Sequence, residues 1–155
     1  MSTTTRNYDK SSADRELTRR EEFSVSGSVL SEAPWGLAAG AGVVTTVADV
    51  ILHLVTLRFA LTGPVELGLV AFFAVAGAGA LLRARRGRAL VWAQTHPWRF
   101  ALLPGAACAV LVFVLSMFVD GGVAGSLFSG LWHGAAAYGV TGLVGSVGRP
   151  RRARG

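Results

Sequence analysis

Three ionisable side chains stand inside otherwise apolar stretches, where they could support proton chemistry. Asp49 and His53 lie in TTVADVILHLVTLRFAL, residues 45–61, and His133 lies in the run 123–147. Residues four apart share one face of a helix, so Asp49 and His53 are close enough to share a hydrogen bond or a proton. An ionised carboxylate at the centre of a bilayer costs about 2.5–3.5 kcal/mol. We therefore expect Asp49 to face other helices and not lipid.

His133 is expected to join this pair. If residues 36–61 and 123–147 cross a bilayer in opposite directions, Asp49 lies at the midplane and both histidines lie slightly outside it, at similar depths. The first and last helices are neighbours in a simple up-down bundle. The sequence thus predicts one buried polar cluster made of Asp49, His53 and His133.

Several kinds of chemistry fit such a cluster. The simplest is a hydrogen-bonded network that fixes how two helices pack. A proton or ion relay also needs a midplane carboxylate beside an imidazole. Two histidines at one depth are compatible with a bis-imidazole haem, although no attachment motif is present. Zinc or copper fits less well, because the cluster offers no close ligand spacing beyond i, i+4.

The sequence predicts neither an enzyme nor a cofactor. No Walker loop, nucleophile elbow, HExxH or dinucleotide fingerprint occurs in the chain. The lone Cys108 excludes an internal disulfide and is expected to be a small packing residue. We therefore expect no catalytic residue, no cofactor-binding residue and no metal ligand.

The elements that position the cluster are long apolar runs. The chain has 155 residues, of which 52% are hydrophobic and only 15% are charged, with a mean hydropathy of +0.49. A helix of about 20 apolar residues crosses a bilayer, and four runs reach that length. They are 36–61, 64–83, 99–120 and 123–147. The fold class expected is all-α, an integral membrane four-helix bundle made of two antiparallel hairpins joined at Thr62-Gly63-Pro64 and Asp120-Gly121-Gly122.

The distribution of arginine predicts the orientation. Basic residues collect in the N-terminal tail, in the connection between the hairpins and at the C-terminal end, while both hairpin turns lack Lys and Arg. The connection contributes Arg83, Arg85, Arg86, Arg88 and Arg99, and the C-terminal end contributes Arg149, Arg151, Arg152 and Arg154. Under the positive-inside rule these segments and both termini are cytoplasmic. Arg58, near the outer end of the first span, is expected to reach the outer headgroups.

The basic surplus also bears on partners and on the two ends of the chain. The formal net charge of +6 is explained by topology, so we expect no nucleic acid, although the central loop is expected to attract anionic lipid headgroups. The mixed-charge residues 1–33 are expected to form a disordered cytoplasmic tail, with a short helix at 11–22 at most. Residues 149–155 are expected to form a basic cytoplasmic tail.

Fourteen of the 15 basic residues are arginine, which favours a GC-rich genome and hence a prokaryotic plasma membrane.

Two further patterns concern packing. Pro34-Trp35 recurs as Pro97-Trp98 at an offset of 63, and Gly68 meets Gly130 at an offset of 62, which indicates a parallel internal repeat of the hairpin. Pairs of small residues four apart let helix backbones approach closely. Such pairs are Gly36 and Gly40, Ala38 and Gly42, Ala74 and Ala78, Gly121 and Gly125, and Gly130 and Gly134.

These observations predict a small polytopic membrane protein that is not an enzyme and acts as an accessory or self-associating membrane component, packing with itself or with another membrane subunit. The alternative is a small oligomeric transporter linked to protons or ions, which would use Asp49, His53 and His133. A pore-forming protein of the phage type is a third option, since small size and a basic C-terminus fit it loosely.

Overall fold

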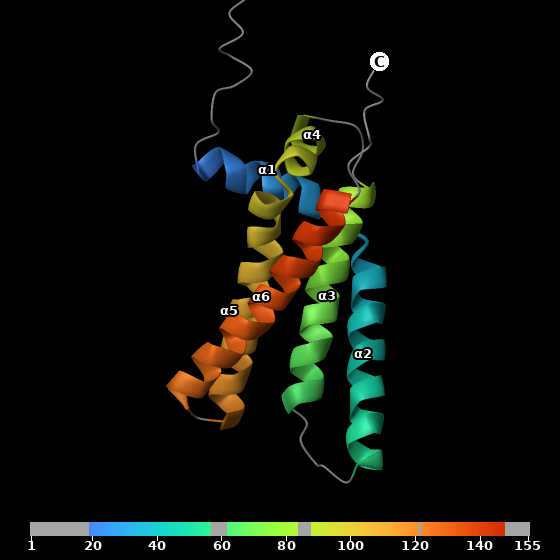
Figure 1. Ribbon diagram of the computed structural model, residues 1–155, viewed down its shortest axis with the longest axis vertical. Coiled ribbons are helices and arrows are strands. Elements are labelled where there is room, and N and C mark those ends of the chain that lie inside the picture. The colour runs from blue at the N-terminus through green and yellow to red at the C-terminus, as the bar shows by residue number, and fades with distance from the viewer. Residues whose placement is uncertain (1–18, 57–61, 84–87, 121, 148–155) are drawn as a thin grey trace, which may run out of the picture.

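The computed structural model describes residues 19–56, 62–83, 88–120 and 122–147 (Figure 1). These residues form six helices and no strand. The helices are α1 (Arg19–Ser31), α2 (Trp35–Val55), α3 (Thr62–Arg83), α4 (Arg88–Thr95), α5 (Pro97–Asp120) and α6 (Val123–Val147). The all-helical fold class is therefore confirmed for the described part of the chain.

Three helices, α2, α3 and α5, are long and apolar enough to cross a membrane. α6 has 25 residues, which include several glycines, serines and His133, and it is not among these three. The expected ends of the second, third and fourth runs agree with the helices to within two residues. The first run is different, because α2 ends at Val55 and not at residue 61; residues 57–61, with Arg58, lie outside the described residues.

Helix α3 lies at the centre of the arrangement. It packs against α2 on one side and against both α5 and α6 on the other, whereas α3 is the only long helix that contacts α2 (Figure 1). The expectation that the first and last long helices are neighbours is therefore wrong for the described residues. The physical reason is that α3 occupies the space between them.

Glycine allows α2 and α3 to approach closely. A Cβ atom built on Gly42 would lie 3.0 Å from the carbonyl oxygen of Gly68, and one built on Gly68 would lie 2.9 Å from that of Gly42 and would also collide with the side chain of Thr46. The Thr46 hydroxyl donates to the Gly42 carbonyl oxygen at 3.0 Å, on its own helix. The backbones themselves therefore form this interface, as small residues permit.

In the second hairpin, glycines also allow close backbone contact between α5 and α6, but in a different register. A Cβ on Gly134 would lie 2.8 Å from the carbonyl oxygen of Gly105, and one on Gly130 would lie 2.6 Å from that of Ala109. A strict repeat of the contact between Gly42 and Gly68 would pair Gly105 with Gly130. The observed pairing is one helical turn further along α6, so the two hairpins do not pack in equivalent register.

The short helices α1 and α4 pack together at the end of the molecule where α3 ends and α5 begins (Figure 1). Val29 and Ala33 are buried in one apolar cluster with Ala80, Ala93 and Phe100. The expectation of a disordered tail over 1–33 is therefore wrong for residues 19–33. Apolar residues spaced along α1 bury against α3 and α5, and this outweighs the mixed charge that suggested disorder. Residues 1–18 and 148–155 lie outside the described residues, as does most of the short helix expected at 11–22.

Candidate functional site

A carboxylate that the motif analysis did not single out lies at the centre of the best candidate site. Glu66 is on the second turn of α3, and only 10% of its side chain is exposed. The Ser116 hydroxyl on α5 lies 2.5 Å from Glu66 Oε1. It also lies 2.9 Å from the Val112 carbonyl oxygen, one turn earlier on its own helix. Glu66 therefore joins α3 to α5 through a buried hydrogen bond.

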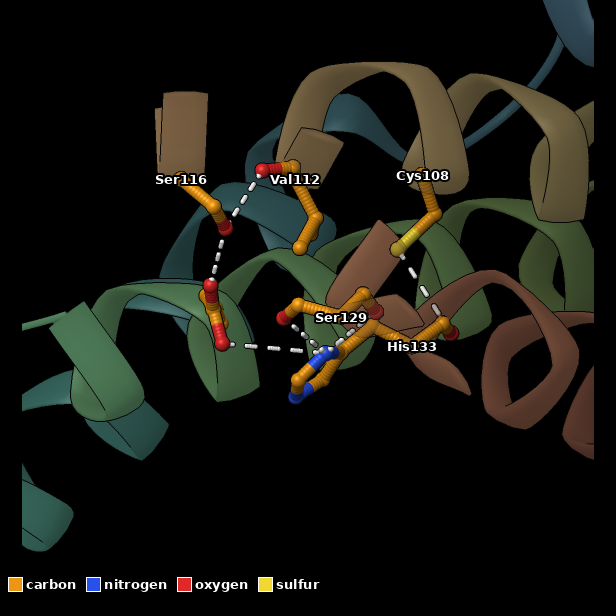
Figure 2. Close-up of polar contacts among 6 residues, drawn as sticks. Cys108, Val112, Ser116, Ser129 and His133 are labelled. Carbon is orange, nitrogen blue, oxygen red and sulfur yellow. Dashed lines mark hydrogen bonds and ion pairs between the residues drawn. The ribbon is translucent and has the colours of Figure 1, made fainter. Parts of the chain in front are cut away.

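His133 brings α6 to the same carboxylate. Its Nδ1 lies 3.7 Å from Glu66 Oε2, 2.9 Å from the Ser129 carbonyl oxygen and 3.2 Å from the Ser129 hydroxyl. A carbonyl oxygen can only accept, so these contacts assign the hydrogen of the neutral ring to Nδ1. Figure 2 shows Ser116 on one side of the site and Ser129 with His133 on the other.

An apolar layer closes the site toward the α1 and α4 end. Cys108, Val112 and Ala137 are fully buried, and the partly buried side chains of Leu69, Val70 and Phe73 pack against them. The Cys108 sulfur lies 3.7 Å from the His133 carbonyl oxygen, on the border of this layer (Figure 2). Further along, the hydroxyl of Thr141 is fully buried with no hydrogen-bond partner, beside Gly77 and Pro104. The polar site and Thr141 are thus separated by apolar side chains.

Asp49 and His53 form a second, smaller pair on α2. The His53 Nδ1 lies 2.9 Å from the Asp49 carbonyl oxygen and 3.4 Å from Asp49 Oδ2, so the ring bonds back to its own helix as that of His133 does. The side chains are more exposed than those of the first site, 18% for Asp49 and 31% for His53. The sequence pattern predicted this neighbouring pair, and the structure brings the two residues together.

The predicted cluster of Asp49, His53 and His133 is not assembled. α2 and α6 do not contact each other among the described residues, because α3 lies between them, and His133 meets Glu66 instead. The two histidines consequently do not face each other across a haem-sized site. α2 is also centred near residue 45, so Asp49 lies about 6 Å from the middle of its helix and not at the middle.

The arrangement supplies acid–base groups. No group of three His, Cys, Asp or Glu side chains in the described ranges is placed to hold a metal ion. A carboxyl group, an imidazole and two hydroxyls can exchange a proton and can hold three helices together.

A signal for Glu66 was present in the sequence. It is the only acidic residue in the run 64–83, but it stands close to the helix start, where a carboxylate is ordinarily stabilised by the helix dipole. Its partners, Ser116 and His133, are 50 and 67 positions away, and no local spacing connects them. Only the packing of α3 against α5 and α6 identifies the group.

Comparison with models of known protein families, with curated proteins and with solved structures finds no match.

We predict an energetic coupling between Glu66 and Ser116. In a double-mutant cycle of Glu66→Ala and Ser116→Ala, measured as free energy of unfolding in lipid or detergent, the two residues should couple by about 0.6–1.7 kcal/mol, the range typical of hydrogen bonds between membrane helices. Ser126→Ala is the matched control, because the Ser126 hydroxyl is buried but bonds only to the Gly122 carbonyl oxygen. Equal coupling energies in the two cycles would show that the Ser116 bond contributes nothing.

Proposed function

We propose that the protein is an integral membrane component with four spans, without enzyme activity, that associates with a second copy of itself. Membrane insertion is supported above all by three helices that are long and apolar enough to cross a bilayer. Their exposed surface supports it: large apolar residues such as Val44, Val55, Phe118 and Trp132 are each more than 60% exposed. Contiguous apolar exposure of this kind is typical of surface that faces lipid.

α6 is proposed as the fourth span. Its 25 residues extend about 37 Å, enough to cross the hydrocarbon core. It packs along α5 in the opposite direction (Figure 1), so a bilayer that contains α5 also surrounds α6. The glycines and His133 that lower its hydropathy are tolerated because Gly130, Gly134 and Gly145 are buried against neighbours.

The proposed orientation places α1 and α4 at the cytoplasmic surface of a prokaryotic plasma membrane, with both termini on that side. Trp35 and Trp98, at this end of α2 and α5, are 46% and 42% exposed, as expected for aromatic rings at a membrane interface. Arg83 at the end of α3, Arg88 at the start of α4 and Arg99 in the first turn of α5 belong to the same end. Anionic lipid headgroups are the proposed partners of these arginines, and nucleic acid is not.

Self-association is proposed through the outer face of α2. Only 11% of the α2 span is buried within the chain, against 39% for α3. On this face Gly36 and Gly40 have nothing within 4 Å of an added Cβ, and Val43, Val47 and Ile51 are exposed beside them. Two glycines four apart, flanked by β-branched residues, form the groove by which membrane helices pair closely with a copy of themselves.

The packing role is favoured over transport through a single copy of the chain. A transport path needs polar groups on both sides of the membrane midplane. In this chain the predicted cluster is divided between two helices that do not touch, and an apolar layer separates the Glu66 site from Thr141. A polar pathway through a single copy is therefore not supported.

We predict that cysteines at Thr62 and Gly122 react with a membrane-impermeant thiol reagent added to intact cells, whereas cysteines at Arg86 and Arg152 do not. The reason is the concentration of arginine at the proposed cytoplasmic end. The measurement uses single-cysteine variants in which Cys108 is replaced by alanine. Labelling of Arg86→Cys in intact cells would contradict the proposed orientation.

We predict that Gly40→Ile lowers the mass of the detergent-extracted protein from that of a dimer to that of a monomer, because the larger side chain holds two α2 helices apart. Gly125→Ile is the matched control, since Gly125 is also helical and open but lies on α6. Light scattering of both variants decides the point. A monomeric wild type, or dissociation by both variants, would refute association through α2.

A further inference from the structure

We propose that Glu66, Ser116, Ser129 and His133 form a binding site for one exchangeable proton. This inference goes beyond the membrane role proposed above and does not depend on self-association. Three helices contribute to the site, and its two titratable groups come from different helices, α3 and α6. The proton comes from water or a buffer acid and returns there, so no electron moves and no bond between heavy atoms changes.

The hydroxyl of Ser116 allows Glu66 to be either ionised or neutral. Ser116 has one hydrogen and two oxygen neighbours, Glu66 Oε1 at 2.5 Å and the Val112 carbonyl oxygen at 2.9 Å. When Glu66 is a carboxylate, Ser116 donates to it. When Glu66 is a carboxylic acid, its own hydrogen is donated to Ser116, which turns to donate to Val112. In both states Glu66 Oε1 and the Ser116 hydroxyl share a hydrogen bond and no heavy atom is displaced, whereas the bond from Ser116 to Val112 is made only when Glu66 is neutral.

His133 offers a second position for the same proton. Its Nδ1 hydrogen is donated to the Ser129 carbonyl oxygen, so the neutral ring carries its free lone pair on Nε2. A proton added there makes an imidazolium whose Nδ1 lies 3.7 Å from Glu66 Oε2. The carboxylate then neutralises the ring across the contact between α3 and α6.

Charge balance explains why the pair holds one proton. With Glu66 ionised and His133 neutral, the site carries a charge of −1 beside the apolar layer of Val112, Leu69 and Phe73, and an uncompensated buried charge is costly. One proton, on either residue, brings the charge to zero. A second would bring it to +1, which is again uncompensated.

Apart from the Cys108 thiol, no other titratable group of the described residues faces this site. On α5 it is faced by Ser116 and by the Cys108 thiol, whose sulfur is directed at the His133 carbonyl oxygen (Figure 2). Asp49 and His53 belong to α2, which packs on the opposite side of α3. α1 and α4 lie at the far end, beyond the apolar layer. Of the two ends of α3, the one at which the helix begins is nearer to the site, one helical turn from Glu66.

The test is to locate the proton by nitrogen NMR of the full chain in lipid nanodiscs, with histidine labelled with ¹⁵N. The His133 signals are assigned by their loss in His133→Gln. In the wild type at high pH we expect a neutral ring with its hydrogen on Nδ1. The comparison is made at the pH where half of the wild-type His133 rings are doubly protonated. At that pH a smaller fraction of the His133 rings is expected to be doubly protonated in Glu66→Gln, because this variant lacks the negative charge of Glu66. Ser126→Ala should match the wild type.

Infrared spectroscopy covers the case in which the proton resides on Glu66. There we expect a carboxylic acid band that appears on acidification, disappears in Glu66→Gln and shifts in Ser116→Ala. This measurement needs only the wild type and Ser116→Ala if Glu66→Gln does not fold. Two results together overturn the proposal. The doubly protonated fraction of His133 is the same in the wild type and in Glu66→Gln, and no carboxylic acid band shifts in Ser116→Ala.

Discussion

The arrangement depends on two different interfaces carried by α3. Gly68 faces α2 through backbone contact, and Glu66 faces α5 and α6 through its carboxyl group. Positions two apart on a helix are separated by about 200°, so these two residues necessarily serve opposite sides. Because α3 occupies the centre, α2 is kept away from α6, and the four residues Asp49, His53, Glu66 and His133 are divided into two separate pairs.

The way each polar side chain finds a hydrogen bond explains why only one of these pairs crosses between helices. Thr46, Ser126 and Ser146 each donate to the carbonyl oxygen four residues earlier. His53 and His133 bond back to their own helices in the same way. An ionised glutamate has only acceptors, and residues 63–70 of its own helix carry no side-chain donor, so Glu66 takes its hydrogen bond from another helix. Ser116 supplies it, and His133 adds a group that can carry the opposite charge.

Much of the fold follows from the sequence. Runs of about 20 apolar residues, broken at Gly63-Pro64 and at Gly121-Gly122, are enough to predict the long helices and their antiparallel pairing. The contact between Asp49 and His53 follows from their spacing of four. What could not be predicted is the order of the helices in space, since that depends on which small residues meet: Gly42 with Gly68, and Gly134 with Gly105. α1 was missed because its burial depends on distant partners such as Phe100.

Helix α3 lies between α2 and α6, so His133 meets Glu66 and not His53. Cross-linking in native membranes with a short bifunctional thiol reagent tests this order of helices, with Cys108→Ala as the background and His133→Cys common to both double variants. We expect that His133→Cys cross-links within one chain to Glu66→Cys and fails to cross-link to His53→Cys. Efficient cross-linking of the His53→Cys and His133→Cys pair within a monomer, with none for the Glu66→Cys pair, would contradict it.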